Sequence, residues 1–347
     1  MNFDEQYMLR AIELAEKGLG KVQPNPMVGA VIVHNQEIIG EGYHEQYGRA
    51  HAEVNAINEV INKHKNAEEL LKNSSLYVSL EPCSHHGKTP PCADLIIKHK
   101  IPRVVISNID PFQSVNGKGV EKLRKAGVEV IVDVLKDKGY QLNKRFFTYH
   151  TLQRPYVILK WAESQDAYIS IAENQRSNIS GAEAKILNHQ WRAQEQAIMI
   201  GTKTAMVDDP YLTVREVEGR NPLRVIIDKD LKLSEDLNIF NDEAKTIVFN
   251  NKKTSIEGNV TFVEIDFYGL VPQFILYQLY LMEIQSVIIE GGAFTINEFI
   301  NFNLWDEARI FKSKTSIHQG VKAPSVSGKL ISKTDIGEDE LLIYERI

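Results

Sequence analysis

The chain is poor in cysteine, because its 347 residues contain only Cys83 and Cys92. Two cysteines cannot form the disulfide framework that holds many small secreted domains together. Long hydrophobic runs are absent too: no segment approaches the roughly 20 consecutive apolar residues that a membrane-spanning helix needs. The first residues are acidic and contain no apolar signal core. We therefore expect a cytoplasmic protein without membrane contact.

A surplus of positive charge is also absent, since the formal net charge is −6 at pH 7. Such a chain has no general attraction for the phosphate backbone, so we expect no nucleic-acid partner. Its hydrophobic content of 43% and charged content of 25% are ordinary for a globular protein. The length exceeds that of one usual core, which predicts two domains, at residues 1–147 and 148–347.

What the chain does contain is one histidine, two thiols and one carboxylate in a pattern typical of zinc enzymes. His51 stands two residues before Glu53, and Cys83 and Cys92 each follow a proline. Three protein ligands leave the fourth tetrahedral position of a zinc ion open, as in catalytic rather than structural sites. Glu53 is close enough to His51 to move protons at such a site without binding the metal. A helix that begins at Cys92 would favour its thiolate.

Two simpler interpretations of the cysteines exist. The thiols lie nine positions apart and could form a single disulfide, or either could be an inert buried residue. Neither interpretation accounts for the His-x-Glu motif or for the two Pro-Cys pairs. Zinc binding is therefore the preferred hypothesis, with the polar segment 84–91 as a loop over the metal site.

Apolar spacing predicts alternating helices and strands in both halves of the chain. Helices are expected at 7–19 and directly after His51 and Cys92. Strands are expected at these positions: 28–33, 38–43, 76–80, 104–106, 128–132, 157–159, 197–200, 224–227, 246–249 and 286–289. The expected strand at 286–289 runs into Glu290-Gly291-Gly292, where backbone N–H groups could approach a phosphate at a helix start. The same glycines could equally form only a tight turn.

With both halves in view, the chain resembles the bifunctional deaminase–reductase family of riboflavin biosynthesis. In the first half the resemblance rests on Asn25 to Ala30, His51 to Val54, and Glu81 to Cys92 with its long spacing between cysteines. In the second half it rests on the following positions: Lys160, Asp166, Ile179-Ser180, Trp191-Arg192, Gly201 to Arg215 and Glu290 to Gly292.

The resemblance implies an α/β protein with two folds and two activities. The first half would be a cytidine-deaminase-like three-layer α/β/α sandwich, and the second a dihydrofolate-reductase-like α/β domain. The first would hydrolyse an amine from a diaminopyrimidinone that bears a phosphoribosylamino group. The second would use NADPH to reduce the ribose to a ribityl chain. A small phosphorylated pyrimidine is then the substrate, and a dimer through the reductase half is expected.

The resemblance also assigns individual residues. His51, Cys83 and Cys92 match the zinc ligands, and Glu53 matches the proton shuttle. Positions that match NADPH contacts are Ala162, Asn178, Thr204, Asp208, Gly292, Ala293, Phe294, Thr295 and Ile296. Positions that match substrate contacts are Asn25, His44, His85, Lys88, Asp110, Arg176, Arg192, Leu212, Arg215 and Glu290. Among these, Arg192 and Arg215 could clamp the substrate phosphate.

The second half departs from the family pattern at several positions. The usual Ser-Leu-Asp-Gly and a basic residue are replaced by Ser164-Gln165-Asp166-Ala167-Tyr168, and Asn178 stands where tryptophan is usual. One alternative is therefore an active deaminase joined to a reductase half that serves only as a dimerisation scaffold. Two others are a deaminase of nucleic acids or free nucleosides and a binding module built on a structural zinc. NADPH oxidation, ammonia release from cytidine or tRNA, and removal of Glu53 would discriminate among them.

Overall fold

The computed structural model describes residues 2–84, 90–112, 115–172, 174–175 and 177–347. The chain divides into two compact units, Met1–Leu152 and Gln153–Ile347. Residue 147, the end of the first domain predicted from the sequence, lies within the last helix of the first unit.

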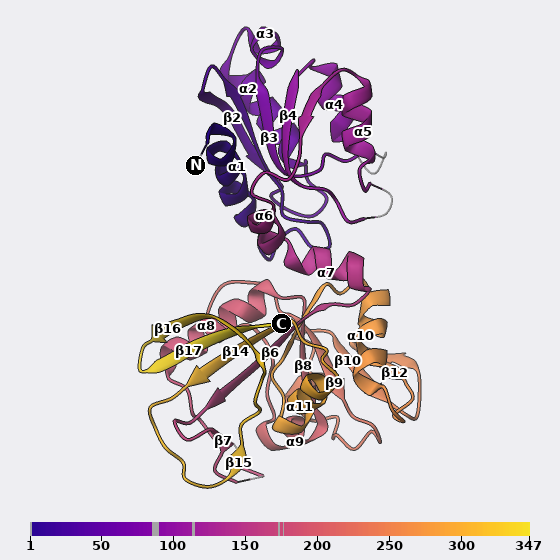
Figure 1. The fold of residues 1–347 in the computed structure, drawn as a ribbon. Coiled ribbons are helices and arrows are strands. Elements are labelled where there is room, and N and C mark those ends of the chain that lie inside the picture. Colours follow the sequence, from indigo (N-terminus) through magenta and orange to yellow (C-terminus); the bar gives the residue numbers. More distant parts are fainter. Residues whose placement is uncertain (1, 85–89, 113–114, 173, 176) are drawn as a thin grey trace. The chain divides into compact units, whose positions relative to one another are not determined.

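The first unit is a five-stranded sheet with helices on both faces (Figure 1). Its strands are β1 (Gly29–His34), β2 (Glu37–Tyr43), β3 (Ser75–Leu80), β4 (Arg103–Asn108) and β5 (Glu129–Ile131). Its helices are α1 (Phe3–Glu16), α2 (Ala52–Lys63), α3 (Ala67–Leu71), α4 (Cys92–Lys98), α5 (Lys118–Lys125), α6 (Lys136–Leu142) and α7 (Lys144–Leu152). The strand order is β2-β1-β3-β4-β5, with β3, β4 and β5 parallel and β1 antiparallel to both of its neighbours.

Alternation along the strands divides the core of this unit into two layers. Ile32 and Val78 face one way and pack with α2, α4 and α5, whereas Val31 and Tyr77 face the other way and pack with α1. Successive side chains of a strand point to opposite faces of the sheet, so strands covered on both faces are apolar almost throughout. The predicted three-layer α/β/α sandwich is confirmed.

The second unit is built on a ten-stranded sheet with the order β11-β12-β10-β9-β8-β13-β6-β14-β17-β16. The strands are β6 (Tyr156–Glu163), β8 (Ala197–Gly201), β9 (Leu223–Ile227), β10 (Thr246–Asn250), β11 (Ser255–Glu257), β12 (Val260–Glu264), β13 (Ser286–Ile289), β14 (Glu307–Lys312), β16 (Gly328–Ile336) and β17 (Asp339–Arg346). Two short strands, β7 (Tyr168–Ser170) and β15 (Val321–Lys322), pair separately. The helices are α8 (Ala182–Gln194), α9 (Thr202–Asp208), α10 (Val271–Leu281), α11 (Ala293–Asn301) and the 3-10 helix η1 (Asn238–Phe240).

The run from β12 to β14 is parallel, and helices cover both of its faces. One face packs against α10 and α11 through side chains such as Leu276 and Phe299, and the other packs against α8 and α9. The carboxyl ends of β8 and β13 therefore lie side by side; β8 leads directly into α9, and a short turn at 290–292 leads from β13 into α11. Ligands of open parallel sheets bind at this edge.

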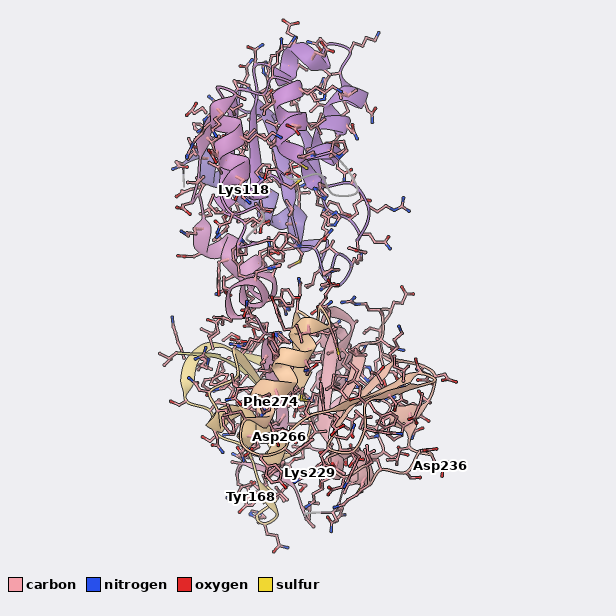
Figure 2. All side chains as sticks on the ribbon, turned by 90° about the vertical axis from the view of Figure 1, so that its right-hand side faces the viewer. Lys118, Tyr168, Lys229, Asp236, Asp266 and Phe274 are labelled. Carbon is pink, nitrogen blue, oxygen red and sulfur yellow. The ribbon has the colours of Figure 1, made fainter. Side chains whose placement is uncertain are left out.

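The turn from β6 to β7 contains one of the departures from the family pattern. Ala167 adopts a φ of +62°, where the family pattern has glycine. The Ala167 N–H still donates to the Ser164 carbonyl at 3.0 Å, so the turn closes despite the side chain. Tyr168 begins β7 (Figure 2). The ammonium of Lys322 lies 3.8 Å from the centre of the Tyr168 ring. Alanine fits this turn, but in a backbone conformation that a Cβ atom disfavours.

We expect Ala167→Gly to stabilise the second unit by about 0.5–1 kcal/mol, because glycine adopts a positive φ without steric cost. Glycine also raises the conformational entropy of the unfolded chain, which lowers stability, but we expect the relief of backbone strain to contribute more to the free energy of unfolding. Chemical denaturation would measure the free energy of unfolding of both proteins. An unchanged or lower midpoint for the glycine variant would contradict the strain at this position.

Candidate active sites

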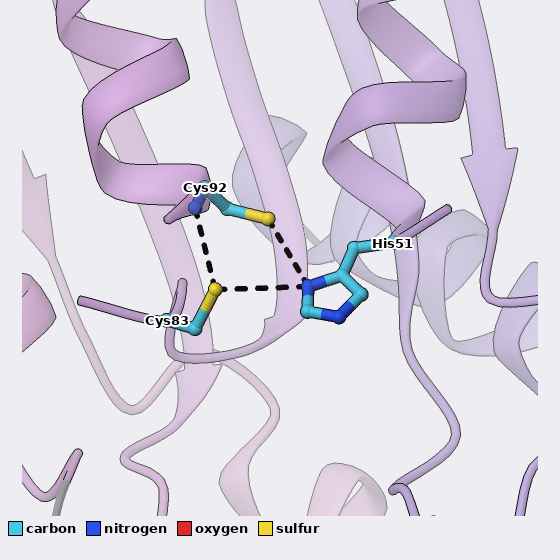
Figure 3. A group of neighbouring side chains, drawn as sticks. All are labelled: His51, Cys83 and Cys92. Carbon is cyan, nitrogen blue, oxygen red and sulfur yellow. Dashed lines mark hydrogen bonds between the residues drawn. The ribbon is translucent and has the colours of Figure 1, made fainter. Parts of the chain in front are cut away.

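Three side chains of the first unit meet at the starts of two helices. His51 immediately precedes α2, Cys92 is the first residue of α4, and Cys83 lies in the loop after β3. Nδ1 of His51 lies 3.3 Å from the Cys92 sulfur and 3.6 Å from the Cys83 sulfur (Figure 3). The ligand atoms of the three residues all lie within 4.8 Å of one another.

This geometry fits a tetrahedral zinc ion. Bonds of about 2.3 Å to sulfur and 2.0 Å to nitrogen place neighbouring ligand atoms roughly 3.5–3.8 Å apart. The donor set points the same way, because both cysteines are free and hydrogen bonds from Cys92 and His51 lower the pKa of the Cys83 thiol. The pKa of Cys92 is instead raised by its hydrogen bond to Cys83 and by burial. A second thiolate at this point therefore needs a cation beside it.

Glu53 lies in the first turn of α2 and is buried. Burial and the neighbouring Cys83 raise its pKa to about 7, against the opposing charge of His51. A carboxyl group with a pKa near neutrality can both take up and release a proton under physiological conditions. Its position two residues after His51 places it beside the three candidate ligands.

Asn25 and His44 form a second layer beside His51. The His44 ring is buried and lies edge-on to the His51 ring, with 5.6 Å between their centres. Nδ1 of His44 donates to the Ala50 carbonyl at 3.0 Å, which leaves Nε2 to accept from the Asn25 amide at 3.1 Å. Burial lowers the pKa of His44, so the ring is neutral at pH 7. The amide of Asn25 is thereby oriented beside the candidate metal site.

Asp110 follows β4 and is also buried. Burial raises its pKa to about 7, although the Phe112 N–H donates to it at 2.8 Å. The nearby charges of Glu81 and Cys83 act in the same direction as burial. The other two substrate positions predicted in this half, His85 and Lys88, lie outside the described residues.

Glu81 has a role that the sequence analysis did not assign. Its buried carboxylate accepts four backbone N–H groups, from Asp110, Gly117, Gly119 and Val120, at 2.8–3.2 Å. Glu81 thereby caps the start of α5 and fixes the loop after β4. Because Glu81 stands two residues before Cys83, these contacts also anchor the chain next to a candidate zinc ligand. The sequence signal was an acid directly after a buried strand, but its partners lie 29–39 positions away.

We expect Glu81→Gln to lower the free energy of unfolding of the first unit by about 2–4 kcal/mol. The amide places an NH₂ group against backbone donors that would then be buried without an acceptor. Thermal or chemical denaturation would measure the change. Glu121→Gln is the control, because Glu121 is exposed and forms an ion pair with Lys125 on the surface of α5. Equal midpoints for the two variants would contradict the capping role of Glu81.

The second unit places three charged side chains together at the carboxyl edge of its sheet. They are Lys160 of β6, Arg192 of α8 and Glu290, which directly follows β13. Arg192 donates from Nε and Nη2 to the two carboxylate oxygens of Glu290, at 3.2 and 2.8 Å. Burial acts to raise the pKa of Glu290, but the charges of Arg192 and Lys160 hold it at about 2. Burial also lowers the pKa of Lys160.

Arg192 and Arg215 therefore have different surroundings. Arg192 is buried, engages Glu290 and also donates to the Thr213 carbonyl at 3.3 Å. Arg215 is exposed, and its guanidinium stacks over the Tyr211 ring at 4.8 Å. Leu212, a third predicted substrate position, lies in the same loop as Arg215. It has a φ of +54° and a buried side chain, so only its backbone can face a ligand.

Two helix starts face each other next to this cluster. A Cβ atom at Gly201 would lie 2.5 Å from Thr295 Oγ1, and one at Gly291 would lie 2.5 Å from the Cα of Ile200. Gly292 has a φ of +40° and lies near Thr204 Oγ1. The starts of α9 and α11 can approach this closely only because both turns lack side chains. Paired helix starts of this kind suit the pyrophosphate of a dinucleotide.

The remaining cofactor and substrate positions of the second half are spread around this edge. Asp208 ends α9, and Ala293, Phe294, Thr295 and Ile296 form the first turn of α11, with Phe294 largely exposed. Ala162 lies on β6 beside Phe311, and Asn178 is exposed in a loop. Arg176 lies outside the described residues. Asn188 Oδ1, one helical turn before Arg192, is buried and accepts from no described residue, so an acceptor is available beside Glu290.

The combination of folds and sites defines a zinc-binding deaminase joined to a reductase. A family model of the cytidine and deoxycytidylate deaminase zinc-binding region matches residues 1–108, and a model of the RibD C-terminal domain matches residues 155–314. The chain is 36% identical to the riboflavin biosynthesis protein RibD of Aquifex aeolicus, covering 99% of this chain and 98% of that protein. It is 39% identical to the RibD of Bacillus amyloliquefaciens, over 94% and 88% of the two chains. The chain belongs to the RibD family of bifunctional riboflavin biosynthesis enzymes.

Solved structures agree over the whole chain. A diaminohydroxyphosphoribosylaminopyrimidine deaminase/5-amino-6-(5-phosphoribosylamino)uracil reductase of Thermotoga maritima is 36% identical, with a TM-score of 0.89 and 99% coverage of both chains. RibD of Acinetobacter baumannii is 31% identical, with a TM-score of 0.90 and the same coverage. The predicted folds and the two activities are confirmed at the level of the family, and a reductase half kept only as a scaffold is not favoured. Among the described residues, no helix is both long enough and apolar enough to cross a bilayer.

Proposed function

We propose that the first half, residues 1–147, hydrolytically deaminates 2,5-diamino-6-(5-phosphoribosylamino)pyrimidin-4(3H)-one. The second half, residues 148–347, then uses NADPH to reduce the ribosyl chain of 5-amino-6-(5-phosphoribosylamino)uracil to ribityl. The observation that carries this proposal is the convergence of His51 Nδ1 and the two cysteine sulfurs beside the buried carboxyl group of Glu53. The Thermotoga maritima relative, whose name includes both activities, supports the choice of substrates.

His51, Cys83 and Cys92 are the residues that would hold zinc. When bound in such a site, zinc lowers the pKa of water from about 15.7 to near 7 and so makes a nucleophile available at neutral pH. Glu53 takes the proton from the attacking water and delivers it to the ring nitrogen. It then transfers the proton of the newly formed hydroxyl group to the amine, which departs as ammonia and leaves a carbonyl group on the ring. The buried position of Glu53 two residues after His51 supports this role, because the group must bind and release a proton next to the metal site within one cycle.

Asn25, His44 and Asp110 hold the pyrimidine or its ribose, and His85 and Lys88 are proposed for the same task. The neutral His44 ring orients the Asn25 amide, which supports a direct contact between Asn25 and the substrate. Asp110 lies at the end of β4, close enough to Cys83 for the two charges to interact. These residues position the ring so that its amine-bearing carbon faces the candidate metal site.

NADPH supplies the hydride of the second step, and the protein mainly positions the cofactor and the substrate. Gly292 to Ile296 and Thr204 would hold the pyrophosphate at the two helix starts, with Asp208, Ala162 and Asn178 as further cofactor contacts. Arg192 and Glu290 contact the substrate as an ion pair, and the Leu212 backbone and the Arg176 and Arg215 side chains bind its remaining polar groups. The exposed Arg215 guanidinium is proposed to bind the phosphate.

The partners of the enzyme follow from these assignments. Its substrate is a small phosphorylated pyrimidine rather than a nucleic acid or a membrane. The enzyme is proposed to act in the cytoplasm, where paired thiols stay reduced. Dimerisation through the reductase half is proposed from the family resemblance.

We expect Glu53→Gln to fold and to retain its zinc, because glutamine keeps the shape of the side chain and is not a ligand. Ammonia release from the diaminopyrimidinone should fall by at least about 100-fold, the lower end of what general acid–base catalysis contributes. Metal analysis and an ammonia assay on the same preparation would measure both properties. Equal deamination rates in the variant and the parent would remove Glu53 from the mechanism.

Arg215→Ala should raise the KM of the reductase step by about 10-fold or more, because the phosphate loses a charged partner. NADPH oxidation with the deaminated intermediate as substrate measures this step, and ammonia release measures the other. The deaminase rate should not change. A parallel fall of both activities would show that the two sites are not independent.

A further inference from the structure

One face of α8 contacts the loop that contains Arg215. Lys185, His189 and Arg192 lie at spacings of four and three residues, so their side chains project from the same side of the helix. The loop residues that they contact are Thr213, Arg215 and Glu216. The loop next to the substrate is thus attached to the helix at three successive points.

The three contacts differ in kind. Lys185 forms an ion pair with Glu216 at 2.6 Å, and its side chain is 60% exposed. Arg192 donates to the Thr213 carbonyl, but it is held chiefly by Glu290. Nδ1 of His189 accepts the backbone N–H of Arg215 at 3.1 Å, and the His189 side chain is buried. The Arg192 contact is buried and the histidine contact is partly buried, so water competes with both less than with the exposed ion pair of Lys185.

His189 is in the protonation state that lets Nδ1 accept the hydrogen bond from the Arg215 N–H. Burial, and then the positive charges of Arg192 and Arg215, lower its pKa to about 4, although Glu216 and Glu290 oppose the shift. The ring is therefore neutral near pH 7, and Nδ1 keeps the lone pair that the Arg215 N–H needs. A protonated ring would present a second donor to that N–H and could not hold the loop.

Arg215 has little else to fix its direction. Its guanidinium stacks on Tyr211, and its Nη1 lies 3.4 Å from Thr213 Oγ1, so both contacts are made within the same short loop. A long exposed side chain binds an anion well only if its backbone is already placed, because ordering it otherwise costs entropy.

We propose that His189 is a positioning residue of the reductase half, which holds the Arg215 backbone so that the guanidinium is presented to the substrate phosphate. This inference rests on the proposed role of Arg215 in phosphate binding. His189 contacts neither the phosphate nor the cofactor in this scheme. It acts through the peptide N–H of Arg215, and its effect belongs to substrate binding rather than to hydride transfer.

The test uses the full-length enzyme and three variants in the NADPH-oxidation assay. His189→Leu fills the space but removes the acceptor, and we expect KM for the deaminated intermediate to rise on the order of 10-fold. We expect kcat to change less than about 2-fold, because uniform binding is lost and the chemical step is untouched. His189→Asn places an amide oxygen near the position of Nδ1 and should restore most of the affinity. Lys185→Ala is the matched control on the same helix face and should change KM less than about 2-fold.

Several outcomes would overturn the inference. They are an unchanged KM for His189→Leu, a loss confined to kcat, an asparagine variant as impaired as the leucine variant, or an equal effect of Lys185→Ala. If His189→Leu fails to fold by thermal unfolding, the comparison of His189→Asn with the parent and with Lys185→Ala decides the question. Arg215→Ala separates the two proposals. If it leaves KM unchanged, the role of Arg215 in the proposed function fails; if it raises KM while the His189 variants do not, only the positioning role fails.

Discussion

Both candidate sites depend on one constraint: parallel strands that lead into helices bring several helix starts to the same edge of a sheet. In the first unit this places His51 and Cys92 at the beginnings of α2 and α4, with Cys83 in the loop after β3. In the second unit it places Gly201 and Gly292 at the beginnings of α9 and α11. The free backbone N–H groups of a helix start favour negative charge. The same arrangement supports the candidate zinc site in one half and the proposed site for the phosphates of the dinucleotide in the other.

The central strands could be predicted from the sequence because each is covered on both faces. Residues 76–80, 197–200 and 286–289 are short apolar runs, and the structure has β3, β8 and β13 there. The strands near the carboxyl terminus gave no such signal. β16 is mostly exposed, with polar and apolar residues mixed along it, and its position follows from pairing with β17. Partner strands, rather than local composition, decide such segments.

The candidate sites show a similar division. Spacing predicted His51, Cys83 and Cys92 as zinc ligands with Glu53 beside them, and the structure brings the three candidate ligands together. Spacing could not reveal the supporting contacts. Glu81 binds backbone groups at the start of α5, and His189 binds the backbone of Arg215, so each partnership exists only after distant segments have packed. The reactive groups of a site are side chains, which the sequence names directly. The supporting contacts are made with backbone N–H groups, which nearly every residue has, so the sequence does not show which of them will be used.

The reductase half also shows how a polar site can be kept in a buried place. Arg192, Glu290 and Lys160 form a cluster in which the carboxylate is ionised because two cations surround it. The isolated charge of any of the three would be costly to bury. Together they form a charged cluster beside the Asn188 side-chain oxygen, which accepts a hydrogen bond from no described residue. The buried cluster thus contains three charged groups, but the negative charge of Glu290 offsets part of the positive charge of Arg192 and Lys160.

The bidentate ion pair between Arg192 and Glu290 has an evolutionary consequence. Each side chain is only 10% exposed, so replacing Glu290 leaves two cations together in the interior, and replacing Arg192 removes the bidentate partner of the Glu290 carboxylate. Descendants of this sequence can change the pair only if both codons change nearly together or a third residue first offers compensation. The two positions should therefore vary jointly among relatives, even though 98 residues separate them along the chain.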